Sequence, residues 1–278
     1  PEFAEAHNNL GIIYLEIGRL TEAVKSYDAA LLINPDYIEA HNNLGVAFKD
    51  LGNLDEALKS YENALAIKPD YAEALNNLGI TLMDIGKLDE AVESYEKALV
   101  AKPDFAYAYN NLGVAFNELY RLDEAAKCFD KALTINTDYA EVYLNRGHLM
   151  TDLHQLDDAL MSYEHANELK SDEDYILGSI LHTKMHLCLW DSLLNHLQDL
   201  TKKINNGQKT ISPFALMALV DDPKLQRKAA EIYATDKFPI SNALPKISRY
   251  PKHKKIRIGY FSADFREHPV STLTVELY

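Results

Sequence analysis

The chain has 278 residues, and its 47% hydrophobic and 25% charged residues match ordinary folded proteins and exclude a disordered polypeptide. Its net charge of -14 is uneven: residues 1–173 carry 13 basic and 32 acidic side chains, whereas residues 174–278 carry 15 basic and 10 acidic. An acidic first part repels phosphate groups, so no nucleic acid partner is expected. Only two cysteines are present, Cys128 and Cys188, which excludes a disulfide scaffold and a cysteine-rich zinc module.

The sequence contains no run of about 18 apolar residues and no basic-then-apolar N-terminal segment. We therefore expect no membrane span and no secretory signal, and we predict a cytoplasmic protein. The chain starts at Pro1 without a methionine and stops at Tyr278 inside an apolar run, so we interpret it as a fragment. His7 and His41 recur one repeat apart, a spacing that does not favour metal ligation, so neither a metal site nor a cofactor is expected in this chain.

A 34-residue period runs without a break through residues 4–173 and gives five repeats. Glycine occupies the eighth position of every repeat, alanine the twentieth and twenty-seventh, and tyrosine or phenylalanine the twenty-fourth; the glycines are Gly11, Gly45, Gly79, Gly113 and Gly147. This pattern resembles the tetratricopeptide repeat, in which each unit is a pair of antiparallel helices. The resemblance implies an all-α fold, a right-handed solenoid over residues 1–173, with the first helix of each pair on its inner wall.

The spacing also predicts how each helix pair packs and where its second helix starts and stops. Small residues let the two helices approach closely while the aromatic ring fills the space between them. Position 18 is predicted to be the N-cap of the second helix, because its side-chain oxygens can accept hydrogen bonds from unpaired backbone N–H groups; its residues are Thr21, Asp55, Asp89, Asp123 and Asp157. Proline is predicted to close the second helix in three repeats, at Pro35, Pro69 and Pro103.

One helical stripe of the first helices carries a repeated set of polar residues. Its sixth position is always asparagine: Asn9, Asn43, Asn77, Asn111 and Asn145. Acidic residues flank this row, among them Glu39 and Glu73 at the second position and Asp50 and Asp84 at the thirteenth. We therefore predict an acidic groove that contains a row of amides.

Two interpretations of the asparagine row remain open. An amide both donates and accepts, so the row could bind the backbone of an extended peptide or protein segment with little dependence on its sequence. Alternatively, the asparagines could bond neighbouring helices to each other. The first interpretation predicts a protein-binding module. The open end of the first repeat exposes a face that another repeat would cover, which also predicts self-association.

The 34-residue period ends near residue 173, and the sequence after it has no repeat. Residues 174–204 are predicted to form a capping helical hairpin, and residues 205–254 a helical and extended linker. Residues 255–278 are predicted to form one strand followed by a helix that begins at Pro269. A single strand–helix unit cannot complete a parallel sheet, so we interpret it as the first piece of a truncated α/β domain.

The segments Ile256-Arg257-Ile258-Gly259-Tyr260, Ser262-Ala263-Asp264-Phe265 and His268-Pro269 resemble the opening of the catalytic region of O-GlcNAc transferase and its bacterial relatives. The resemblance implies a parent enzyme that transfers N-acetylglucosamine from UDP-GlcNAc to serine or threonine, with the repeats holding the acceptor protein. It places His268 near the active site, as a candidate catalytic base or orienting residue. The chain itself is expected to be inactive because it lacks the nucleotide-sugar site. The alternative function is a stand-alone repeat scaffold for protein assembly.

Overall fold

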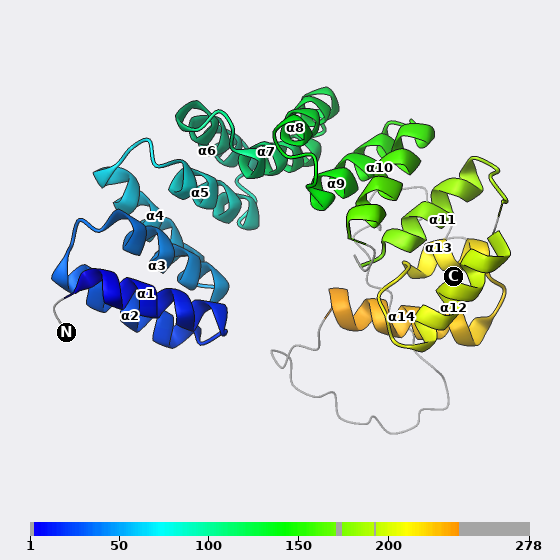
Figure 1. The fold of residues 1–278 in the computed structure, drawn as a ribbon, viewed down its shortest axis with the longest axis horizontal. Coiled ribbons are helices and arrows are strands. Elements are labelled where there is room, and N and C mark those ends of the chain that lie inside the picture. Colours follow the sequence, from blue (N-terminus) through cyan, green and yellow to red (C-terminus); the bar gives the residue numbers. More distant parts are fainter. Residues whose placement is uncertain (1–2, 171–173, 192, 239–278) are drawn as a thin grey trace, which may run out of the picture. The chain divides into compact units, whose positions relative to one another are not determined.

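The computed structural model describes residues 3–170, 174–191 and 193–238. These residues form 14 α-helices and no strand (Figure 1). Ten helices make up an array of five antiparallel pairs: α1 (Ala4–Glu16) with α2 (Leu20–Ile33), α3 (Ile38–Asp50) with α4 (Leu54–Ile67), α5 (Ala72–Asp84) with α6 (Leu88–Ala101), α7 (Ala106–Glu118) with α8 (Leu122–Ile135), and α9 (Ala140–Asp152) with α10 (Leu156–Leu169). The array confirms the helical repeat predicted from the 34-residue period.

Close contact between glycine and an aromatic ring holds each pair together. A Cβ atom added to Gly79 would lie 2.5 Å from Cε1 of Tyr95, which is closer than real Cβ atoms approach. All five repeats have the same contact, and the ring of each aromatic residue is almost fully buried. The predicted complementarity of small and large residues is therefore confirmed, and the contact leaves no room for a side chain at the glycine.

The predicted N-cap position is wrong. Asn53 is the N-cap residue of α4, and Asp55 is the second residue of the helix rather than the residue before it. None of the second helices in the array has a side-chain hydrogen bond at its N-cap. An acidic residue in the first turn still interacts favourably with the positive end of the helix dipole. This electrostatic effect explains the acidic residues at position 18 without a capping hydrogen bond.

Proline follows the second helix closely in the first three repeats. For example, α2 ends at Ile33, two residues before Pro35. However, α8 ends at the same point of its repeat, although Thr137 replaces the proline. There the Oδ1 atom of Asn136 accepts a hydrogen bond from the backbone N–H of Asp138 at 3.1 Å, and this side-chain turn redirects the chain. Proline thus marks the helix end but is not required for it.

The way the pairs stack defines two unequal sides of the array. Each second helix packs against the first helix of the next pair, and the first helices of successive pairs also contact one another. In the described part of the chain, successive second helices make no contacts of similar extent. The first helices therefore lie on the more closely packed side. We call the exposed surface of α1, α3, α5, α7 and α9 the inner face.

Residues 174–238 form a second packing unit that continues from the array. It contains α11 (Ile176–His186), α12 (Leu193–Asn205), α13 (Pro213–Leu219) and α14 (Pro223–Lys237). We call this unit the C-terminal helical cluster; its core includes Leu181, Leu200, Ile204, Ile211, Leu216 and Leu225. Helix α11 packs on α10, but it makes few contacts with α12, which packs on α14 instead. Part of the predicted linker thus contributes α13 and α14 to a shared core.

The remaining predictions for the C-terminal part fall outside the described residues. These are the extended connector after Phe238, the strand–helix unit of residues 255–278, and His268. Among the helices that are described, none combines the length and the apolar character needed to span a membrane.

Candidate functional site on the inner face

The asparagines of the inner face form a ladder of hydrogen bonds between successive first helices. The Nδ2 atom of Asn77 on α5 donates to Oδ1 of Asn42 on α3 at 3.0 Å. The same bond recurs with Asn43 and Asn8, Asn111 and Asn76, and Asn145 and Asn110, at 2.9–3.1 Å. The acceptors occupy the fifth position of the repeat and are buried, whereas the donors occupy the sixth position. One N–H group of each donor asparagine is therefore used to connect two repeats.

The ladder uses only part of the hydrogen-bonding capacity of the sixth-position asparagines. Each carboxamide has two N–H donors and one carbonyl acceptor. In the described structure, the Oδ1 atoms of Asn77, Asn111 and Asn145 accept no hydrogen bond, and their side chains remain half-buried. Asn9 is exposed on α1. The same residues can thus connect the helices and offer polar atoms to a ligand.

The second-position glutamates are in part already paired. The Nζ atom of Lys102 lies 3.0 Å from Oε1 of Glu73. Burial acts to raise the pKa of Glu73, but the hydrogen bond from Lys102 and the nearby positive charges outweigh it, and the net pKa is lowered. The Nδ2 atom of Asn110 donates to Glu141 at 3.3 Å, whereas Glu39 is exposed. This row is therefore less negative than the sequence pattern suggests.

Most of the thirteenth-position carboxylates form no ion pair. Asp50 has a nearby cation, since its Oδ1 lies 3.7 Å from Nζ of Lys49. Asp84, Glu118 and Asp152 form no ion pair with any described residue. Carboxylates without an ion pair thus lie in both rows of the inner face, Glu39 in one and Asp84 in the other. Among the described residues, no group of three or more histidine, cysteine or acidic side chains is arranged to hold a metal ion.

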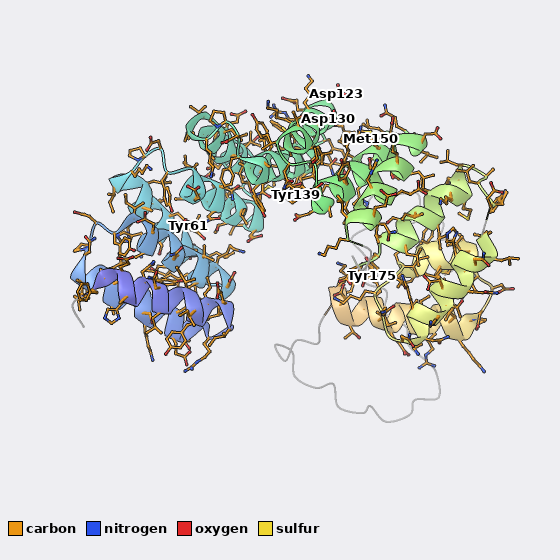
Figure 2. All side chains as sticks on the ribbon, viewed as in Figure 1. Tyr61, Asp123, Asp130, Tyr139, Met150 and Tyr175 are labelled. Carbon is orange, nitrogen blue, oxygen red and sulfur yellow. The ribbon has the colours of Figure 1, made fainter. Side chains whose placement is uncertain are left out.

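Aromatic residues at the start of α7 and α9 also lie on this site, although they were not predicted as site residues. Tyr107 is 60% exposed, and its ring lies 5.1 Å from that of Tyr139, measured between centroids. Figure 2 shows Tyr139 on the opposite side of the array from Asp123 and Asp130, which project from α8. Tyr107 replaces the glutamate found at this position in the other four repeats. This departure from the repeated glutamate was the feature of the sequence that could have identified Tyr107 as a site residue.

Comparisons with known proteins agree with this geometry. A family model described as TPR repeat matches residues 13–52, 47–86 and 81–119, and a second, described as Tetratricopeptide repeat, matches residues 105–137. Residues 13–137 therefore consist of tetratricopeptide repeats. The fifth repeat lies beyond the matched residues, but α9 and α10 have the same lengths and the same glycine–aromatic contact as the other pairs. No curated protein matches the sequence.

Solved structures of other proteins share the fold. PilF of Pseudomonas aeruginosa has a TM-score of 0.66 and 23% identity, with 72% of this chain and 90% of that chain covered. PilW, a type IV pilus biogenesis factor, also has a TM-score of 0.66, with 20% identity and coverages of 73% and 94%. YrrB, described as a TPR protein with an unusual peptide-binding site, has a TM-score of 0.51 and 21% identity, with coverages of 66% and 93%. At these identities the likeness supports the fold alone.

Proposed function

We propose that the inner face binds extended segments of other proteins. The observation that carries this proposal is the row of half-buried carboxamides whose Oδ1 atoms have no partner, on Asn77, Asn111 and Asn145. An extended peptide presents alternating N–H and C=O groups, so a carboxamide can bond to it whatever its side chains are. The exposed ring of Tyr107 adds apolar contact area beside the row.

The charge of the inner face favours particular segments. Asp84 and Glu118 carry negative charge that no described cation neutralises, so segments with basic residues should associate faster and bind more tightly. The fold itself is consistent with this role, since YrrB is described as having a peptide-binding site. The acidic inner face argues against acidic peptides and nucleic acid as ligands.

Selection from a phage-displayed library of random 16-residue peptides tests the proposal. The enriched peptides would be synthesised, and their dissociation constants measured against the wild-type chain and two variants. Tyr107→Ala removes an exposed ring from the inner face and should weaken binding about 10-fold, because interface aromatics are typical hot spots. Val100→Ala is the matched control, since Val100 is 84% exposed on the second helix α6. Failure to enrich any peptide, or equal effects of both variants, would contradict the proposal.

We further propose that the bound segments are acceptors for an O-GlcNAc-transferase-like activity of a longer parent protein. The support is the likeness of residues 256–269 to the opening of that enzyme's catalytic region. In such a reaction a serine or threonine hydroxyl would displace UDP from UDP-GlcNAc, with His268 near the reacting atoms. The complete gene product should transfer labelled N-acetylglucosamine to hydroxyl-containing peptides selected on the array, and residues 1–278 alone should not. If the complete product has no such activity, the alternative of a stand-alone assembly scaffold holds.

A further inference from the structure

A pocket lies where the ends of α7 and α9 meet α11. It has a volume of about 740 Å³ and is lined by Asn117 and Glu118 from α7, Asp152 from α9, and His182 and His186 from α11. Glu118 and Asp152 are the last two members of the thirteenth-position carboxylate row. The pocket therefore joins the inner face of the array to the first helix of the C-terminal helical cluster.

Three side chains of this pocket, Glu118, Asp152 and Asn117, have acceptor atoms without a donor among the described residues, and both carboxylates are exposed to solvent. Neither Glu118 nor Asp152 forms an ion pair with a described residue, and no lysine or arginine is part of the lining. The Oδ1 atom of Asn117 is buried and has no hydrogen-bond partner. Buried acceptors are normally satisfied, so an orphan beside two unpaired carboxylates indicates a missing donor. The chemistry that completes this set is a positively charged group with several N–H bonds.

The two histidines are poorly placed to carry charge together. Their rings meet edge to face with centroids 4.6 Å apart, and their Nε2 atoms are 3.3 Å apart, so protonation of both would place like charges in contact. Burial, and then the proximity of His186, lowers the pKa of His182. The imidazole ring of His182 presents a flat face on which a planar cation can stack.

Two aromatic side chains at the rim are held there by a strained backbone. Tyr120 and His154 both line the pocket and both have φ of 57°, in the left-handed region. The equivalent residue in the first three repeats is glycine, at Gly18, Gly52 and Gly86. A left-handed conformation disfavours residues other than glycine, so these two positions keep side chains at an energetic disadvantage. Tyr120 is 87% exposed, and its ring is free to cover a cation.

We propose that this pocket binds an arginine side chain of the protein segment that lies along the inner face. The proposal deepens and rests on the proposed function. A guanidinium carries five N–H donors in a planar fork, which suits two carboxylates and a carboxamide oxygen, and its faces suit the surrounding rings. An ammonium group offers fewer donors and no flat face. Arginine is therefore the better fit than lysine.

The direct test uses a small probe, so that it does not depend on the rest of the groove. Nα-acetyl-arginine amide would be titrated into the protein with carbon-13-labelled histidine, and the signals of His182 and His186 followed by NMR, assigned with their alanine variants. Nα-acetyl-citrulline amide is the matched probe, because it has nearly the same shape but no charge. We expect saturable shifts with the arginine probe and binding about fivefold weaker or more with citrulline.

Variants locate the effect. The double variant Glu118→Gln, Asp152→Asn should remove the preference for arginine over citrulline, whereas Asp123→Asn, which neutralises an exposed carboxylate on α8, should keep it. Equal binding of the two probes, no histidine shifts, or an unchanged preference in the double variant would overturn the proposal. A different result would contradict the proposed function, namely an unchanged dissociation constant of the selected peptides in the Tyr107→Ala variant. Peptide binding without an arginine preference would leave that function intact and refute the pocket assignment.

Discussion

The repeat array and the C-terminal helical cluster are both helical, but different interactions hold them together. In the array each pair depends on one recurring contact, a glycine pressed against an aromatic ring, and each repeat bonds to the next through asparagines. In the cluster the start of α11 is fixed by the backbone, since Gly178 donates to the carbonyl of Thr210 at 2.8 Å. Non-local contacts of this kind have no period. The difference explains why one region could be predicted from its sequence and the other only in part.

The largest effect should come from breaking the glycine–aromatic contact. Tyr95 is 1% exposed, and Tyr95→Ala should lower the free energy of unfolding by about 3–5 kcal/mol, because a large buried ring leaves a cavity. Tyr95→Phe is the control, and Phe129 at the same position of the fourth repeat indicates that the ring suffices. Urea unfolding followed by circular dichroism measures both. A loss below 1 kcal/mol for Tyr95→Ala would contradict this account of pair packing.

The next largest effect should come from the asparagine ladder. Replacing Asn43, Asn77 and Asn111 by alanine removes three hydrogen bonds between repeats and should cost about 1.5–4 kcal/mol of stability. It also removes the free Oδ1 atoms, so peptide binding should weaken in the same variant. Thermal melting and peptide affinity, measured together, separate the two roles. Weaker binding with unchanged melting would mean that the ladder contributes little to the fold.

The sequence predicted the array well because its contacts repeat at fixed spacing. The glycines, the buried aromatic residues and the helix ends at Pro35 and Pro69 all followed from one 34-residue frame. The N-cap prediction failed because an acidic residue is favourable both at the N-cap and in the first turn of a helix. These positions are only one or two residues apart, and the sequence does not locate a helix start that accurately. Within the site, the partner of each asparagine could not be predicted, since it depends on how successive helices are offset.

The same reasoning accounts for the C-terminal helical cluster. Proline often begins a helix, so Pro223 predicts the start of α14. Residues 213–219 were predicted only as a short apolar stretch, and they form helix α13. The core that α13 and α14 share with α12 was not predicted, because contacts between helices far apart in sequence leave no local pattern. The pocket near Asp152 was also missed, since it requires three helices to be placed in space.

Acid should weaken an ion pair of the C-terminal helical cluster, between Lys209 and Asp236. Hydrogen bonds from Lys209 and then Tyr175 lower the pKa of Asp236 from 3.8 to about 2. The folded state thus favours the ionised carboxylate, so this contribution to stability is complete above about pH 4 and is lost as the pH falls towards 2. Trp190, the only tryptophan, lies between α11 and α12 and reports on this region.

Fluorescence of Trp190 should therefore change as the pH falls from about 4 towards 2. Asp236→Asn should make this change less dependent on pH between 4 and 2. At alkaline pH both regions should lose stability, because burial first raises the pKa of Tyr27 and Tyr163 in the array and of Tyr175 in the cluster to about 12. Their contribution is complete below pH 10 and decreases above it. An unchanged Trp190 signal between pH 4 and 2, or unchanged stability above pH 10, would contradict these assignments.

The smallest expected effect concerns the strained position that follows each first helix. Tyr120→Gly should raise stability by about 0.5–1 kcal/mol, because glycine adopts a φ of 57° without strain but loses more conformational entropy on folding. The reciprocal change Gly86→Tyr, at φ of 78° in the preceding repeat, should lower stability by a similar amount. No atom lies within 4 Å of a Cβ added to Gly86, so the loss would reflect backbone strain and not a clash. Chemical denaturation of the two variants under identical conditions measures the difference.

The same variant connects the strain to the pocket. If Tyr120→Gly gains stability but loses the arginine preference of the pocket, the strain is retained for binding. If it gains stability and keeps the preference, the strained tyrosine has no part in the site.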